Sequence, residues 1–481
     1  MSDSVPSTAD VAARLRALQA GDLPVHGGRT LAYVYDSGLA EVDRLGRDAV
    51  ATFAGTNGLD PTAFPSMLAM ENELVGFACD LVDAPEGAVG TVTSGGTESC
   101  LLAVQTARDS RPDVTRPSLV MASTGHAAFR KAAHYFGVDL RVVPVGGDFR
   151  ADPAAMEAAI DDSTVLVVAS APSYAHGVVD PVPAIAAAAA ARGVRCHVDA
   201  CIGGWVLPYA ARLARPVTPW TFAVDGVTSI SMDTHKYAYA PKGTSVLLHR
   251  DSALRRPQFF ASADWPGYTM LNTTLQSTKS GGPLAGAWAV VQAVGDPGYL
   301  ALAEQAFAAV DAIVGLVEAQ PGLRVVVRPD STLVTLVTDG TCDAFTVCDE
   351  LSARGWFVQP QLSFGGAPPT IHLSVSAATL AHVDELGGAL ADAVAAAVEA
   401  GPVLVDPEVA AFIAALDPLS LGDDDFAGLL AASGLVGESA DGSLELPSRM
   451  APINAMLDLA SPAMREALLV AFLDRLARPV R

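Results

Sequence analysis

Short apolar runs and helix-type patterns alternate along residues 90–250. SLVMAS (118–123) and TVLVVAS (164–170) have the length and composition of buried strands, whereas HAAFRKAAHYFG (126–137) has the spacing of a helix. Such alternation is typical of βαβ units, so it predicts a mostly parallel sheet covered on both faces. The other predicted strands are DLRVVPV (139–145), VRCHVDA (194–200), GVTSISMD (226–233) and GTSVLLHR (243–250), and the other predicted helices are ESCLLAVQTARDS (98–110) and PVPAIAAAAAARG (181–193).

The pattern changes after residue 285. Two long helical patterns, 285–295 and 298–319, lead into the strand-like runs RVVVRP, TLVTLVT and IHLSVS, with helices predicted around 345–355 and from about Leu380. From Gly401 onward, acidic and turn-rich stretches precede two or three amphipathic helices. We therefore expect an N-terminal segment (1–55), a large α/β domain (56–305), a small α+β domain (306–400) and a helical extension (401–481).

Composition narrows the class of protein. The 481 residues are 51% hydrophobic and 17% charged, which indicates a globular chain, and the net charge of −23 argues against nucleic acid or an anionic membrane surface as a partner. The start MSDSVPSTAD resembles neither a signal peptide nor an anchor. Six cysteines without a CxxC pair, and scattered histidines, predict reduced thiols, a cytoplasmic protein and no metal site.

Lysine is rare in this chain, which has only Lys131, Lys236, Lys242 and Lys279. Two of the four lie six residues apart in SMDTHKYAYAPKG (231–243), and Lys236 follows His235 just past a predicted strand. A lysine in a cleft at a strand end can lose its proton and form a Schiff base. The alternative is a solvated surface lysine, which the scarcity of lysine makes less attractive.

Three other short stretches end strands or begin helices. In TSGGTESCLLAV (93–104), free N–H groups at Gly95, Gly96 and Thr97 could hold a phosphate, although a plain helix start is the commoner meaning. Asp199 closes a buried strand and needs a cation or hydrogen-bond donors, unless it only caps a helix. His126 opens a helix and could stack on a flat cofactor, or be purely structural.

Taken together, these features fit pyridoxal 5′-phosphate. That cofactor needs a lysine for its aldehyde, an acid for its pyridine nitrogen, a phosphate cradle and a group lying flat on its ring. Lys236, Asp199, the 94–97 loop and His126 supply these in turn. Four matches in one chain carry far more weight than any one of them.

The chain resembles fold type I (aspartate-aminotransferase-like) pyridoxal-phosphate enzymes of the group II decarboxylase branch, and within it the sphingosine-1-phosphate lyases. The similarity runs from about Tyr35 to Ser376, and its most specific block is GVTSISMDTHKYAYAPKG (226–243). The other matching stretches are FPSMLAMENELV (64–75), VTSGGTES (92–99), HAAFRKAAHYFGV (126–138), HGVVDPVP (176–183), HVDACIGG (197–204) and the glycine pair 281–282.

The resemblance implies a homodimer with active sites at the subunit interface. It implies that Lys236 bonds to the cofactor, that Asp199 pairs with the pyridine nitrogen and that His126 stacks on the ring. The residues implied to hold the cofactor phosphate are Gly96, Thr97, Ser170 and His235, with Gly282 arriving from the partner, and those implied for the substrate phosphate are Tyr35, Asn57, Lys242 and Lys279. The implied reaction is a retro-aldol cleavage of a phosphorylated amino alcohol, such as a sphingoid base phosphate, into an aldehyde and an amine phosphate.

Departures from the family pattern keep other functions open. Asp60 stands where the family usually has a phosphate-binding histidine, Lys279 replaces an arginine, and Ala238 replaces a glycine. An amino-acid decarboxylase of the same fold is the alternative, although PPTIHLSVS offers His372 and no arginine to hold a carboxylate, and Arg354 is too far upstream. A catalytically inactive scaffold that uses the 401–481 tail for interaction is a third hypothesis. The retained Lys236, Asp199 and His126 argue against it.

Overall fold

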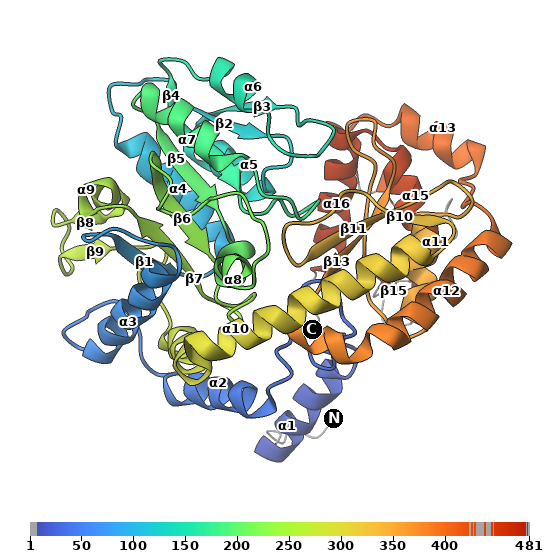
Figure 1. Cartoon of the computed structure of the whole chain (residues 1–481), viewed down its shortest axis with the longest axis horizontal. Coiled ribbons are helices and arrows are strands. Elements are labelled where there is room, and N and C mark those ends of the chain that lie inside the picture. Colours follow the sequence, from blue (N-terminus) through green and yellow to red (C-terminus); the bar gives the residue numbers. More distant parts are fainter. Residues whose placement is uncertain are drawn as a thin grey trace.

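The computed structural model describes residues 7–477 and 479, apart from 423–424, 427, 430–436, 439–443 and 446. Its centre is a seven-stranded sheet with the order β1-β7-β6-β5-β4-β2-β3 (Figure 1). Only β7 runs against its neighbours, so the predicted mostly parallel sheet is confirmed. The strands are β1 (Val89–Thr93), β2 (Ser118–Ala122), β3 (Asp139–Val143), β4 (Thr164–Ser170), β5 (Arg195–Asp199), β6 (Val227–Met232) and β7 (Ser245–His249).

Alternate residues of these strands face two separate apolar cores. Leu119 and Met121 of β2 pack with helices α4 (Gly96–Asp109) and α5 (Ala127–Phe136), whereas Val120 and Ala122 face the other core. That second core includes residues of α3 (Pro65–Leu81), α6 (Pro153–Ala158), α7 (Val182–Ala191) and α8 (Leu207–Arg212). Burial on both faces explains why β2 and β4 are apolar at nearly every position and not at every second one.

Helix α10 (Gly281–Ala319) joins the two halves of the chain and contains the predicted boundary at residue 305. Its direction changes at Gly295 (φ 60°, ψ 174°), the residue that ends the first of the two helices expected from the sequence. Its start packs against α2 (Ala40–Thr52), and a Cβ on Gly282 would lie 2.9 Å from the Val50 carbonyl oxygen. By length and composition alone α10 could cross a membrane, but half of its most apolar stretch is buried in the protein, as in a core helix.

The second half forms a four-stranded antiparallel sheet with the order β10-β11-β13-β12, covered by helices. RVVVRP forms a shorter strand than expected, because the chain leaves the sheet after Val326, whose N–H still donates to Thr335, and reaches Gly177, whose carbonyl accepts a hydrogen bond from Asp330 N. The elements are β10 (Leu323–Val325), β11 (Leu333–Thr338), α11 (Ala344–Ala353), β12 (Gln359–Gln361), β13 (Thr370–Ser374), η3 (Ala377–His382) and α12 (Val383–Ala400).

The tail contains α13 (Pro407–Ala415), α15 (Ala451–Leu459) and α16 (Pro462–Leu476), which share a small apolar core. It lies against the small sheet region (Figure 1). The Asp349 carboxylate accepts hydrogen bonds from Met450 N and Ala451 N at 3.0 and 2.9 Å, and Asp458 accepts one from Ser363 N at 2.6 Å. Residues 423–424 and 427 of the acidic stretch LGDDDFAG, and residues 439–443 of GESADGS, lie outside the described residues.

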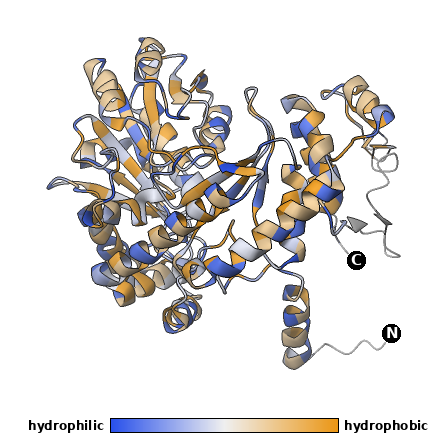
Figure 2. Cartoon of the chain, turned by 45° about the vertical axis from the view of Figure 1, so that its right-hand side comes forward, coloured by the Kyte–Doolittle hydropathy of each residue, from blue (hydrophilic) through white to orange (hydrophobic). Residues whose placement is uncertain are grey.

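Helix α1 (Thr8–Gln19) stands away from the body of the chain (Figure 2). None of its residues is buried, and Val11, Leu15 and Leu18 are exposed at helical spacing. The remaining short elements are η1 (Gly203–Trp205), α9 (Ser252–Arg255), η2 (Arg256–Gln258), β8 (Phe260–Ser262), β9 (Met270–Asn272), β14 (Gly437–Glu438) and β15 (Leu444–Glu445).

Candidate active site

The carboxyl ends of the parallel strands bring the predicted cofactor residues to one edge of the sheet. Ser170 and Asp199, the last residues of β4 and β5, are direct partners in the sheet, and Asp233 follows β6. Asp233 N donates to the Cys201 carbonyl oxygen at 3.0 Å, which ties the loops after β5 and β6 together. Ligands of open α/β sheets bind at this edge.

Lys236 forms an ion pair that the sequence analysis missed. Its Nζ lies 3.0 Å from Asp233 Oδ2, and only 20% of the lysine side chain is exposed. Burial works to lower the pKa of Lys236, but the charge and hydrogen bond of Asp233, together with Tyr35 and Cys201, outweigh it and hold this pKa above its usual range. Burial likewise works to raise the pKa of Asp233, and Lys236 with His235 holds it below its usual value. The sequence feature that could have identified Asp233 is its position three residues before Lys236.

The loop before α4 packs directly on the loop that carries Lys236. A Cβ on Gly96 would lie 2.6 Å from the Asp233 carboxylate, and one on Gly95 would lie 3.4 Å from His235 Cε1. The Gly95 cap has no side chain to accept from the first N–H groups of α4, so these donors at Gly96 and Thr97 are available to an anion.

Asp199 is buried at the end of β5, and its Oδ1 accepts a hydrogen bond from Cys201 N at 3.1 Å. Behind it, His197 is fully buried between Ser229 and Ser231, and burial lowers the pKa of His197 to about 4. His197, Ser229 and Ser231 therefore carry no charge, and Asp199 is the one carboxylate beside them.

His126 and Ser170 flank this centre. His126 is exposed and caps α5, where its Nδ1 accepts from Ala128 N at 3.1 Å, a role that leaves its stacking on the cofactor a prediction. Ser170 is buried, and its N–H donates to Asp180. Burial raises the pKa of Asp180 to about 6.

On the substrate side, Lys242 lies near the centre with an unusual set of partners. Its Nζ donates to the carbonyl oxygens of Tyr33 and His235 at 2.9 and 3.3 Å, and lies 5.1 Å from the Tyr35 ring centroid. The Lys242 residue as a whole is exposed, yet partial desolvation of its ammonium, together with the charge of Lys236, lowers the pKa of Lys242 to about 8. Within the described part of the chain, no carboxylate forms a salt bridge with Lys242.

The other predicted substrate-phosphate residues are occupied within their own chain. Lys279 Nζ lies 2.7 Å from Glu71 Oε2 and donates to the Val92 carbonyl oxygen. Asn57 Oδ1 accepts from Leu59 N at 3.1 Å. Asp60 is exposed and accepts from the N–H and hydroxyl of Thr62. Gly282, predicted to serve the partner's site, lies at the start of α10 against α2.

Tyr174 was not selected from the sequence, yet the fold brings it to the site. Its ring stacks on His372 with centroids 4.3 Å apart, and its hydroxyl donates to Gln359 Oε1 at 2.5 Å. Burial raises the pKa of Tyr174, Tyr35 adds to this, and the charge of Lys236 works against it. No local pattern marks this tyrosine, because its partners lie about 190 residues further along the chain.

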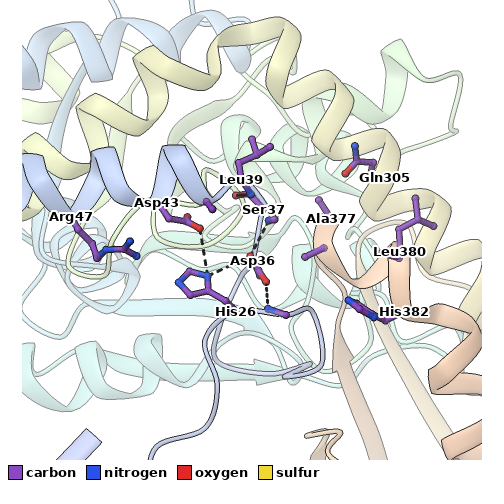
Figure 3. Close-up of a pocket in the computed structure, with 15 residues that line it drawn as sticks. His26, Asp36, Ser37, Leu39, Asp43, Arg47, Gln305, Ala377, Leu380 and His382 are labelled. Atoms are coloured by element: carbon purple, nitrogen blue, oxygen red, sulfur yellow. Dashed lines mark hydrogen bonds and ion pairs between the residues drawn. The ribbon is translucent and has the colours of Figure 1, made fainter. Parts of the chain in front are cut away.

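A pocket of about 800 Å³ lies between the 26–47 segment and η3 (Figure 3). In it, His26 Nδ1 lies 3.6 Å from Asp36 Oδ1 and 3.5 Å from Asp43 Oδ2. These side chains are possible metal ligands, but backbone N–H groups already bind both oxygens of Asp36. We interpret His26, Asp36 and Asp43 as structural residues that hold the segment carrying Tyr35 in place. The donors to Asp36 are Gly27, Gly28 and Gly38.

Comparison with known proteins decides the family. Residues 32–337 match the pyridoxal-dependent decarboxylase conserved domain, and residues 407–475 match the family described as pyridoxal-dependent enzyme, C-terminal putative HTH domain. The chain belongs to the pyridoxal-dependent decarboxylase family. The residues gathered at the carboxyl edge of the sheet are consistent with this family.

Individual relatives add detail. The sphingosine-1-phosphate lyase of Oryza sativa is 38% identical over 342 residues, covering 69% of this chain and 62% of that protein. The structure of a Burkholderia pseudomallei sphingosine-1-phosphate lyase has a TM-score of 0.78 at 32% identity and covers 83% of this chain and 93% of that one. A Lactobacillus brevis glutamate decarboxylase (TM-score 0.72, 19% identity, 84% and 96% covered) shares the fold. This chain spans less than two thirds of the length of the Oryza sativa relative.

The residues at the sheet edge fit the family cofactor, pyridoxal 5′-phosphate. Among the described residues, Asp233 Oδ1 and His235 Nδ1 are buried without a hydrogen-bond partner, which is costly unless a bound group supplies one. The open N–H groups of α4 suit the phosphate, Asp199 suits the pyridine nitrogen and Lys236 suits the aldehyde. The chain is therefore a pyridoxal-phosphate enzyme, and the fold type I prediction is confirmed.

Proposed function

We propose that this enzyme is a carbon–carbon lyase that cleaves a phosphorylated amino alcohol, such as a sphingoid base phosphate, into an aldehyde and an amine phosphate. Several relatives bear the name sphingosine-1-phosphate lyase. The observation that carries the proposal is Lys242, a cation without a carboxylate partner among the described residues, held beside Lys236 and Tyr35. A phosphate is a natural partner for such a group.

Each residue at the centre then has a defined task. When bound, pyridoxal phosphate supplies an electron sink for the bond broken at the amine-bearing carbon. Asp199 holds a proton at the pyridine nitrogen, because a buried carboxylate stabilises a cation next to it. Asp233 keeps the Lys236 amine in place and sets its proton affinity. Tyr174 lies where its phenol oxygen can meet the hydroxyl or ammonium of a substrate.

The decarboxylase alternative requires a group that holds a carboxylate. His372, on the strand where an arginine would serve, is fully buried, and burial lowers its pKa to about 3, so it is neutral. Arg354 is bound to Glu350, which also pairs with Arg449 before α15. Neither side chain offers a positive charge to the site, which favours the lyase.

Assembly and location belong to the same proposal. We propose a homodimer, because α1 exposes Val11, Leu15 and Leu18 to solvent and none of its described residues is buried. We propose a location in the cytoplasm, because the six cysteines include no CxxC pair and all are free thiols. Residues 407–475 hold eleven acidic and three basic side chains, a balance that would repel a phosphate backbone. We therefore propose that this extension packs on the small domain and does not bind nucleic acid.

Product analysis of the purified holoenzyme tests the function. We expect a long-chain aldehyde and ethanolamine phosphate from a phosphorylated sphingoid base, and no carbon dioxide from a panel of amino acids. Release of carbon dioxide instead would make the enzyme a decarboxylase. A purified protein without cofactor absorbance and without either product would revive the scaffold hypothesis.

A further inference from the structure

One row of the small sheet holds the loop that carries Tyr174. Thr335 of β11 pairs with His372 of β13, and His372 pairs with Gln359 of β12. Directly opposed residues lie on the same face of a sheet, so these three side chains form a row.

All three members of the row contact the 174–175 segment. Thr335 Oγ1 donates to the Ala175 carbonyl oxygen at 2.6 Å, His372 stacks on the Tyr174 ring and Gln359 Oε1 accepts the Tyr174 hydroxyl hydrogen. Gly177 closes the loop, because a Cβ there would lie 2.3 Å from the Leu333 carbonyl oxygen. The phenol is therefore fixed by the small domain and not by the strand that precedes it.

The row also determines which way the phenol hydrogen points. A hydroxyl has one hydrogen to donate and two lone pairs that accept. Since the hydrogen goes to Gln359, the oxygen is left to accept, with the Ser374 hydroxyl as one donor within its own chain and the charge of Lys236 close enough to act on it. His372 lends no charge, and its Nδ1 has no hydrogen-bond partner among the described residues.

We propose that the row of Thr335, His372 and Gln359 makes Tyr174 a hydrogen-bond acceptor that selects amines without a carboxylate. A substrate hydroxyl or ammonium can donate to the phenol oxygen, whereas a carboxylate oxygen would face its lone pairs. Gln359 and His372 are positioning residues, and Tyr174 is the group that meets the ligand. This inference rests on the proposed function for the phosphate end of the ligand.

Two ligands that differ by one carboxylate test the row. Ethanolamine phosphate and phospho-L-serine are titrated into the holoenzyme, and binding is followed by the visible absorbance of the cofactor. The wild type should bind ethanolamine phosphate more tightly. Gln359→Leu frees the phenol hydrogen, so we expect the preference to fall about tenfold, the effect of about one lost hydrogen bond.

A matched control lies two residues along the same strand. Gln361 accepts from Thr370 at 2.7 Å in the next cross-strand pair, so Gln361→Leu removes a similar bond away from Tyr174 and should leave the preference unchanged. In a Tyr174→Phe background, Gln359→Leu should change the preference less than twofold.

The inference would be overturned if Gln359→Leu weakened the binding of both ligands equally. It would also be overturned if Gln359→Leu reduced the preference by the same factor in the wild type and in Tyr174→Phe. An unchanged preference would overturn it too. The titration measures binding and not turnover, so its outcome can be separated from that of the product analysis. If the wild type releases no aldehyde and the preference still depends on Gln359, the proposed reaction fails and the selection by Tyr174 holds.

Discussion

The cofactor side and the substrate side of this site are built differently. On the cofactor side, Asp199 and Asp233 end buried strands, and polar atoms there lack partners until a ligand arrives. On the substrate side, Lys279 and Asp60 already bind Glu71 and Thr62 of their own chain. The sheet edge thus positions the residues that carry the chemistry. Substrate choice depends on loop residues, and most of these must give up a hydrogen bond or ion pair within the chain before they can bind the substrate.

The largest effect is expected from removing Lys236. Lys236→Ala should lower turnover by more than about a thousandfold and abolish the cofactor's visible absorbance band, because among the described residues no other lysine forms a salt bridge with Asp233. Absorbance spectra and steady-state rates measure this. Lys131→Ala, on the outer surface of α5 beside Tyr135, is the control and should behave as wild type. An unchanged spectrum in Lys236→Ala would place the cofactor elsewhere.

Asp233→Asn should come next, with kcat lowered by roughly ten- to a hundredfold. Removing the charge of Asp233 lets burial lower the pKa of Lys236, so the pH profile of kcat should move to lower pH. Rate measurements across pH show the shift. Asp225→Asn, an exposed neighbour upstream of β6, is the control. A loss of rate with no change in the profile would mean that Asp233 only supports the fold.

Lys242 tests the substrate side through pH. Because burial and Lys236 lower its pKa to about 8, the ammonium loses its charge as the pH rises through that value, and the KM for a phosphorylated substrate should then increase. Lys242→Ala should raise KM about tenfold at neutral pH with little change in kcat.

The control for this prediction is Lys242→Arg, which stays charged throughout the accessible range. Its KM should remain flat with pH. A KM that rises equally in the wild type and in Lys242→Arg would assign the pH dependence to another group.

Asp60→His should have a smaller effect, a two- to fivefold lower KM for a phosphorylated substrate. It removes a negative charge from the 57–62 turn and adds a donor, and the exposed position keeps the gain modest. Asp60→Asn separates the two contributions, because it removes only the charge. No change in KM with either variant would mean that the 57–62 turn stays away from the substrate phosphate.

The smallest effect on activity is expected in the tail. Asp349→Ala removes the acceptor of two N–H groups at the start of α15, so the docking of the tail should lose about 1–2 kcal/mol. Limited proteolysis should then release fragments that end after residue 400, while the rate changes less than twofold. Asp384→Ala, exposed on α12, serves as the control. A tail that remains resistant to protease would show that its apolar contacts hold it without Asp349.

The sequence by itself determined the sheet and the cofactor centre. Alternating strand and helix patterns are local, so β2, β4, β5 and β6 lie within a residue or two of their predicted bounds. The residues that carry pyridoxal chemistry lie in short segments next to those strands. They meet because the carboxyl ends of parallel strands share one edge, whatever the rest of the chain does.

Tertiary structure alone decided which charges are free. Lys236 and Lys279 both stand in polar loops, yet one meets Asp233 three residues away and the other meets Glu71 across the fold. The same holds for Tyr174, whose orientation depends on Gln359 in another domain. The Lys279–Glu71 and Tyr174–Gln359 pairs are separated by about 200 residues, and no local pattern encodes them, whereas Asp233 is near Lys236 in the sequence itself. Burial and hydrogen bonding become defined only when distant segments pack, and these set both the pKa of Lys242 and the direction of the Tyr174 hydroxyl.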